Sequence, residues 1–169
     1  ENFLKKEDFT KLQKYCNENK FEIINVGEKD FSVLETPAWL IDKLQIPKKE
    51  LILTFIRNAH KEFDTDLRIH ADNIINNRKT SLASVLYINE DENISANGTA
   101  FYEHKVYGKE LPRDISVEDF NKLLIEDSND HEKWDLTSIV ESKPNRMVRY
   151  NSNLFHSKYP KIVKQGVRI

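Results

Sequence analysis

A series of six short segments rich in apolar and aromatic residues occupies the chain from residue 67 onward, and it constrains the fold more than any other feature. Turn residues separate the segments, notably Asn76-Asn77 and Asn97-Gly98. Short strands at this spacing are typical of a β-sandwich or of a barrel of the jelly-roll type. The expected strands are residues 67–72, 81–89, 99–107, 145–150, 154–157 and 162–169.

The residues before this series predict a supporting N-terminal part. After Phe3, apolar residues recur at helical spacing, which predicts a helix of about three turns. Two short strands are expected at 21–26 and 31–34, and the apolar run within 50–59 predicts a buried strand. Residues 37–44 are compatible with a helix or a strand. We therefore expect a mainly β protein with flanking helices, of the α+β class, in which residues 1–49 support the barrel.

One stretch interrupts the β series. Residues 117–127 follow the cap candidate Ser116 and place Phe120, Leu123 and Leu124 at helical spacing. The region from about 105 to 143 is therefore predicted to be a helical insertion between two barrel strands. A long insertion of this kind is either a lid over a site or a passive decoration. We expect the whole chain, residues 1–169, to be one domain.

The composition argues against several classes of protein. A net charge of −2 disfavours broad binding to nucleic acid, which needs a basic surface. No apolar run approaches the length of a membrane span. Cys16 is the single cysteine and falls on the apolar stripe of the N-terminal helix, so we expect it to be buried and the protein to be cytoplasmic. The sequence does not specify an oligomeric state.

The tripeptide His70-Ala71-Asp72 is the strongest candidate for a functional site. On a strand, residues two apart point to the same face, whereas on a helix they diverge by about 200°. The preceding residues favour a strand, and His156 lies in another predicted strand that can supply a third ligand. Two histidines and one carboxylate hold non-haem iron(II) and leave other coordination positions open. The same ligand set can also hold zinc with an open position.

Other residues offer similar donors. Chance supplies a His-x-Asp tripeptide in roughly one of three chains of this composition, so the tripeptide by itself is a weak signal. His60-Lys61-Glu62 has equivalent spacing, but it lies in a polar stretch that favours a hairpin turn over an inward-facing strand. His104 and His131 lie in or beside the predicted insertion, where we expect them to be exposed.

Beyond the tripeptide, the chain resembles the prolyl-hydroxylase-like branch of the 2-oxoglutarate- and iron(II)-dependent dioxygenases. That family has a His-x-Asp pair often followed by Asn, a strand ending in a Tyr-Leu-Asn-like triplet, a strand led by Gly, and a distal His followed by a basic residue. The matching blocks occur here in the same order, at residues 67–73, 84–89, 97–102, 145–148 and 154–157, with Arg168 after them.

The resemblance implies a double-stranded β-helix, a cupin-like jelly roll, in which His70, Asp72 and His156 hold the iron. Arg168 corresponds to the basic residue that anchors the distal carboxylate of 2-oxoglutarate. A permanently charged guanidinium with two parallel donors suits that role. Lys164 is a competing anchor, because the spacing from His156 to Arg168 is longer than is usual in the family.

Tyr87 corresponds to a family position whose hydroxyl hydrogen-bonds the same distal carboxylate. A plain core tyrosine fits its predicted strand nearly as well, because either face of that strand can be the interior. Tyr102, Tyr107 and Trp134 of the predicted insertion either cover the site or pack the insertion onto the barrel.

The implied activity is hydroxylation coupled to oxidative decarboxylation of 2-oxoglutarate, with iron(II) as the cofactor and ascorbate as a candidate reductant. A carboxylate at Asp72 argues against the halogenating variant of this chemistry, in which chloride needs that position. The substrate is expected to be a small molecule or a peptidyl side chain, and the family branch favours an amino-acid or peptidyl one. Two alternatives use the same residues: a cupin-like module that binds without catalysis, and a zinc hydrolase. A hydrolase has no need of Arg168 as an anchor.

Overall fold

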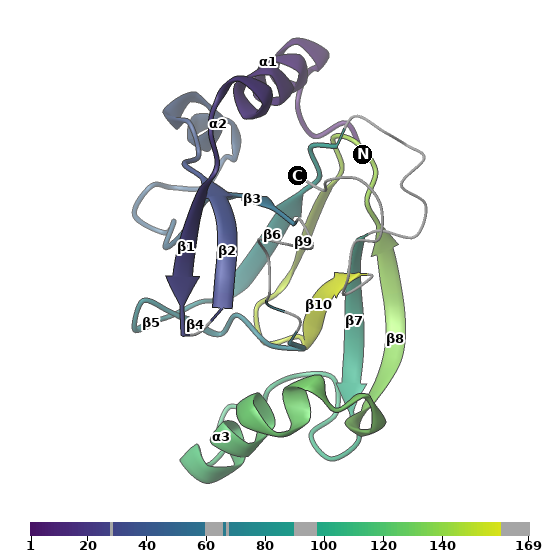
Figure 1. The fold of residues 1–169 in the computed structure, drawn as a ribbon. Coiled ribbons are helices and arrows are strands. Elements are labelled where there is room, and N and C mark those ends of the chain that lie inside the picture. Colours follow the sequence, from purple (N-terminus) through teal and green to yellow (C-terminus); the bar gives the residue numbers. More distant parts are fainter. Residues whose placement is uncertain (28, 60–65, 67, 90–97, 160–169) are drawn as a thin grey trace.

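Strands outnumber helices in this computed structural model, which describes residues 1–27, 29–59, 66, 68–89 and 98–159. Helices α1 and α2 lie at one end of the molecule and α3 at the other (Figure 1). In chain order the elements are α1 (Lys6–Glu18), β1 (Glu22–Val26), β2 (Lys29–Leu34), α2 (Ala38–Lys43), β3 (Ile56–Asn58), β4 (Ile74–Ile75), β5 (Arg78–Lys79), β6 (Leu82–Leu86), β7 (Gly98–His104), α3 (Val117–Ile125), η1 (Asp127–Asn129), η2 (His131–Lys133), β8 (Trp134–Glu141), β9 (Met147–Asn151) and β10 (His156–Tyr159).

All strand pairs in the described part of the chain are antiparallel. The sheets have the orders β1-β2-β3, β10-β7-β8, β4-β5 and β6-β9. The predicted α+β class with mostly antiparallel strands is therefore confirmed. The described strands do not close into the predicted jelly roll. The strand predicted at 162–169 lies outside the described residues. None of the described helices is long and apolar enough to span a membrane.

Pairing between β10 and β7 fixes which side chains share a face of their sheet. His156 lies opposite Phe101, and Lys158 lies opposite Thr99. Because side chains alternate along a strand, these four residues project from one face and Ser157 projects from the other. The two faces of this sheet therefore have different surroundings, and His156 belongs to the face that also carries Lys158.

Gly98 begins β7 at a point of close approach to β8. A Cβ atom at this position would lie 1.9 Å from the Val140 carbonyl oxygen, far inside van der Waals contact. The same carbonyl oxygen accepts a hydrogen bond from the Tyr87 hydroxyl at 3.4 Å. A side chain at residue 98 would therefore push β8 away from Tyr87.

The N-terminal core joins α1 and α2 to the strands. Cys16 is buried on α1, as predicted, and burial raises the pKa of its thiol to about 11. Asn145 fastens the segment before α1, because its side chain accepts from Leu4 N–H and donates to the Leu4 carbonyl oxygen, both at 2.8 Å. The buried residues of this core are Leu4, Leu12, Cys16, Leu40, Ile56 and Ile88.

The predicted buried strand at 50–59 was wrong in length and in burial. Only Ile56–Asn58 form β3, because β2 ends at Leu34 and offers no partner beyond it. Leu53 and Phe55 remain 50% and 44% exposed. The residues after β2 turn instead into helix α2, which resolves the choice left open for 37–44 in favour of a helix.

Helix α3 forms inside the predicted insertion. The Ser116 hydroxyl caps it by accepting a hydrogen bond from Asp119 N–H at 3.0 Å. Residues 134–141, within the predicted range of 105–143, form β8 and pair with β7. The connection between these two strands is therefore 105–133, and β8 belongs to the sheet.

Helix α3 packs on the face of the β10-β7-β8 sheet that lies opposite His156. The Ser157 hydroxyl donates to the Tyr102 hydroxyl at 3.3 Å, which places Tyr102 on the Ser157 side. Tyr102 and Trp134 are therefore packing residues, one of the two roles left open for them. They belong to a core cluster with Ile69, Ala100, Leu111, Leu123 and Phe155.

Candidate metal centre

His70 and His156 face each other across an antiparallel bridge. His70 N–H donates to the His156 carbonyl oxygen at 3.0 Å, and His156 N–H donates to the His70 carbonyl oxygen at 2.9 Å. Residues paired in this way project their side chains to the same side. The two imidazole centroids are consequently 4.5 Å apart. The strand predicted at 67–72 is reduced to this bridge in the described residues.

Asp72 is fixed through its backbone. Its N–H donates to the Ser152 carbonyl oxygen at 2.8 Å, and its carbonyl oxygen accepts from the Thr80 hydroxyl at the end of the β4-β5 hairpin. The carboxylate is thereby aimed at both histidines. Oδ1 lies 3.6 Å from His70 Nε2, and Oδ2 lies 3.3 Å from His156 Nε2. The structure thus brings together the three residues predicted as iron ligands.

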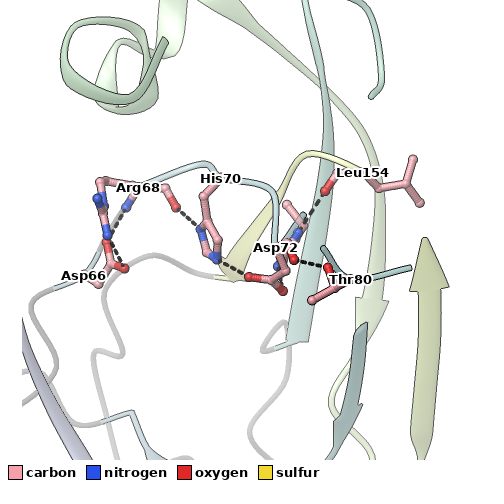
Figure 2. Close-up of polar contacts among 7 residues, drawn as sticks. Asp66, Arg68, His70, Asp72, Thr80 and Leu154 are labelled. Carbon is pink, nitrogen blue, oxygen red and sulfur yellow. Dashed lines mark hydrogen bonds and ion pairs between the residues drawn. The ribbon is translucent and has the colours of Figure 1, made fainter. Parts of the chain in front are cut away.

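The second ring nitrogen of each histidine sets its tautomer. His70 Nδ1 lies 3.0 Å from the Arg68 carbonyl oxygen, as Figure 2 shows, and His156 Nδ1 lies 2.9 Å from the Leu154 carbonyl oxygen. A carbonyl oxygen can only accept, so each Nδ1 carries a proton and donates. In the neutral rings, Nε2 then has a free lone pair. Ligating histidines in metal sites are held in the same way.

Lone pairs from three side chains therefore converge. The ligand atoms of His70, Asp72 and His156 all lie within 4.8 Å of one another. Neutral Nε2 atoms repel a facing carboxylate unless a second proton or a metal cation lies between them. Burial lowers the pKa of His70, and His156 lowers it further, which disfavours the proton. The arrangement therefore favours a cation.

Asp72 stays ionised beside the histidines. Burial alone would raise its pKa, but a hydrogen bond from a protonated His156 ring and the positive charges of a protonated His70 and of Arg57 hold the pKa below its usual value. The side chains of His70 and Asp72 are 27% and 30% exposed, whereas that of His156 is 7% exposed. The cluster is therefore accessible from the His70 and Asp72 side.

An ion pair next to His70 supports the cluster and was not predicted from sequence. Arg68 Nε and Nη2 donate to the two carboxylate oxygens of Asp66 at 2.8 Å and 3.1 Å (Figure 2). Burial opposes ionisation of Asp66, but these hydrogen bonds and the positive charge of Arg68 outweigh it and lower the pKa of Asp66 to about 2. The pair orients the residue whose carbonyl oxygen accepts from His70 Nδ1.

Tyr150 is a second residue of the centre that sequence reasoning missed. Its ring packs edge-on against His156 with centroids 4.8 Å apart, and against Phe101 with centroids 5.1 Å apart. Burial raises its pKa far above the usual value, and Asp72 adds to the effect. In the structure, β9 carries Tyr150 on the same face as Val148, opposite Ala83 and Val85 of β6, a pairing of distant segments that the sequence alone does not give.

Tyr87 is buried, and its hydroxyl contacts the neighbouring sheet. It lies 2.7 Å from the Thr99 hydroxyl and donates to the Val140 carbonyl oxygen at 3.4 Å. Thr99 is in turn opposite Lys158 on β10. Tyr87 lies directly after β6, and its hydroxyl reaches β7 and β8. Its role toward a carboxylate stays a prediction.

The predicted anchors and the rival pair fall on other parts of the chain. Arg168, Lys164, His60 and Glu62 lie outside the described residues. Lys158 was not among the predicted anchors, although it lies two residues from His156 and shares a face of β10 with it. It is a further cation whose position relative to the cluster is fixed by strand geometry.

His104 is buried, contrary to the expectation that it would be exposed. It is 1% exposed, and its ring stacks on Tyr107 and meets Trp134 edge-on. The expectation failed because β7 runs to His104, which places the residue under the helical connection instead of within it. His131, in contrast, is exposed as expected.

Residues 41–162 match the model of DUF6445, a protein family of unknown function. This match covers more than half of the chain, so the chain belongs to that family. No curated protein and no solved structure matches the chain significantly.

Proposed function

We propose that this member of the DUF6445 family is a non-haem iron(II) oxygenase that couples oxidative decarboxylation of 2-oxoglutarate to hydroxylation of a substrate. The observation that carries the proposal is the convergence of three lone-pair donors. In their neutral forms, His70 and His156 present Nε2 lone pairs, and both Nε2 atoms face the carboxylate of Asp72. Two histidines and one carboxylate with open positions are typical of iron(II) oxygenases.

The spacing of the donors fits a metal ion. Two ligand atoms about 2.1 Å from a metal lie about 3.0 Å apart at a right angle and about 3.4 Å apart at a tetrahedral angle. The Nε2-to-carboxylate separations of 3.3 Å and 3.6 Å are close to this range.

The protein's part in the reaction is binding and orientation. Bound iron(II) would supply the activation of molecular oxygen. The bridge between His70 and His156 and the backbone contacts of Asp72 hold the three ligands on one side of the ion. The exposed fractions of His70 and Asp72 leave a path for small molecules from that side. Tyr150 and Phe101 cover His156 and exclude water from its side of the centre.

We propose further that the β10-β7-β8 and β6-β9 sheets are two walls of a jelly roll. Two contacts between the sheets support this. The Tyr87 hydroxyl reaches Thr99, and the Tyr150 ring packs on Phe101 and His156. The inner faces defined by these contacts are the faces that carry the cluster.

The anchor for the distal carboxylate of 2-oxoglutarate is proposed to be Arg168, with Lys164 as the competing residue. Lys158 is added because it lies one pleat from His156 on the same face of β10. That pleat spans about 6.8 Å, which is comparable to the length of a five-carbon dicarboxylate. Replacing each cation by Ala and measuring the affinity for 2-oxoglutarate identifies the anchor as the residue with the largest loss.

The substrate is proposed to be an amino acid, a peptidyl side chain or another small molecule, in a cytoplasmic protein. No strong feature of the sequence favours nucleic acid, in keeping with the net charge of −2. A screen for hydroxylated products in the presence of 2-oxoglutarate, iron(II) and ascorbate would identify the substrate class.

Anaerobic addition of iron(II) and 2-oxoglutarate should produce a weak visible charge-transfer band, and oxygen should then yield succinate. His70→Ala should abolish the band, whereas His60→Ala, at the rival pair, should leave it unchanged. Metal binding without turnover of 2-oxoglutarate for any substrate would indicate a binding module and overturn the proposal. Hydrolysis that depends on zinc and is indifferent to oxygen would overturn it in favour of a zinc hydrolase.

A further inference from the structure

Tyr150 brings a hydroxyl without a protein partner to the candidate metal centre. The residue is only 8% exposed, and its ring contacts His156 and Phe101. Within the described part of the chain, its hydroxyl makes no hydrogen bond, and the hydroxyl oxygen is not fully buried. The hydroxyl is therefore free to bond a ligand or water that reaches it.

Asp72 and Tyr87 lie close enough to Tyr150 to affect its hydroxyl electrostatically. A phenol is protonated at neutral pH, so Tyr150 offers a hydrogen-bond donor, and the contact of its ring with His156 brings that donor to the metal ligands. The Tyr87 hydroxyl is already paired with the Thr99 hydroxyl at 2.7 Å.

We infer that the Tyr150 hydroxyl donates a hydrogen bond to the carboxylate of a 2-oxo acid at the end of the acid that chelates the metal. The inference rests on the proposed function, because it requires a metal held by His70, Asp72 and His156. The contact of the Tyr150 ring with His156 favours the chelating end over the distal end. Tyr150 thus orients the co-substrate, while His70, Asp72 and His156 hold the ion.

Tyr102 is a matched control for Tyr150. It is also 8% exposed and lies on β7 of the sheet that contains His156. Its hydroxyl, however, accepts a hydrogen bond from Ser157 on the opposite face of that sheet. A change of Tyr to Phe therefore removes one hydroxyl from a mostly buried residue in each variant, but only Tyr150 packs on the face that carries His156.

The test uses wild-type protein, Tyr150→Phe and Tyr102→Phe, each loaded anaerobically with iron(II). Pyruvate and 2-oxoglutarate are then titrated, because pyruvate has the chelating 2-oxo acid but no distal carboxylate. Iron affinity should be equal in all three proteins, since Phe keeps the ring packing on His156. Tyr150→Phe should bind both acids about 10- to 100-fold more weakly, as expected for a lost hydrogen bond to a charged group, and should shift the charge-transfer band. Tyr102→Phe should change neither.

Equal acid affinities and an unshifted band in Tyr150→Phe would overturn the inference and leave the proposed function intact. Weaker binding of 2-oxoglutarate but not of pyruvate would also overturn it, since the hydrogen bond would then lie at the distal carboxylate. Failure of the wild-type protein to bind iron(II) would instead overturn the proposed function and the inference with it.

Discussion

Two contacts between a histidine and an aspartate have the same length but different chemistry. In the metal centre, His156 Nε2 lies 3.3 Å from Asp72 Oδ2. At the helical connection, His104 Nε2 lies 3.3 Å from Asp127 Oδ2. The distance alone therefore does not distinguish a ligand cluster from a structural pair.

The partner of Nδ1 makes the distinction. His104 Nδ1 accepts hydrogen bonds from Val106 N–H at 3.2 Å and Tyr107 N–H at 3.3 Å, so it carries no proton. In the neutral ring, the proton of His104 is then on Nε2, the atom that lies 3.3 Å from Asp127 Oδ2. His156 has the opposite tautomer, because its Nδ1 faces a carbonyl oxygen. In the first contact the proton lies on the nitrogen nearest the carboxylate, although the two atoms do not meet hydrogen-bond geometry. In the second, lone pairs face each other and a cation is needed between them.

Neutralising the aspartate of each contact should separate the two roles. Asp72→Asn should weaken iron(II) binding at least about a hundredfold, because it removes a charged ligand, and even indirect partners of ligands are worth 10- to 100-fold. Asp127→Asn should leave iron affinity unchanged. Anaerobic isothermal titration of both variants checks the prediction. Equal losses in the two variants would contradict the distinction between the contacts.

The free energy of unfolding of the same two variants should change in the opposite order, with the larger loss in Asp127→Asn. Asp127→Asn leaves the buried His104 facing an amide whose orientation is set by other contacts, and should reduce the free energy of unfolding by about 1–3 kcal/mol. Asp72→Asn removes a charge that faces unprotonated nitrogens, so the metal-free protein should lose little or gain stability. Urea unfolding of the metal-free proteins measures both effects. A larger loss in Asp72→Asn than in Asp127→Asn would be evidence against the tautomers assigned above.

The ion pair beside the centre should contribute stability in a defined pH range. The pKa of Asp66 is about 2 in the folded protein and higher in the unfolded chain. Its contribution is therefore present above about pH 4 and is lost as the pH falls through the folded pKa. Asp66→Asn should lower the free energy of unfolding by up to about 2 kcal/mol near neutral pH. This difference from wild type should become smaller toward pH 2.

Asp42→Asn is the control for this change, because Asp42 pairs with Lys48 at an exposed site where such a pair contributes little. The measurement is the free energy of unfolding of wild type and of both variants across the pH range. If the difference between wild type and Asp66→Asn does not depend on pH, the charge of the Asp66 carboxylate does not contribute to stability, which would contradict the prediction.

The grouping of His70, Asp72 and His156 could be predicted from sequence because strand geometry acts locally. Residues that are two apart on a strand share a face, which is enough to place His70 and Asp72 side by side. His156 was expected as the third ligand because it lies in another predicted strand. The chain also places turns where sequence indicated them: Asn76 and Asn77 both have positive φ in the β4-β5 hairpin.

The remaining features depend on contacts between distant segments. The role of Tyr150 follows from packing across two sheets, and the burial of His104 follows from its packing against Tyr107 and Trp134. The length of β3 depends on where β2 ends. The tautomers are a different case: their partners, at Arg68 and Leu154, are two residues away in sequence, but the contacts exist only in the folded backbone.

The most direct test of the metal centre is anomalous diffraction at the iron absorption edge from crystals grown anaerobically with iron(II). The account predicts one strong peak within bonding distance of His70 Nε2, His156 Nε2 and a carboxylate oxygen of Asp72, and none at His104. A peak bound by other residues, or no peak at the three ligands under saturating iron(II), would contradict it.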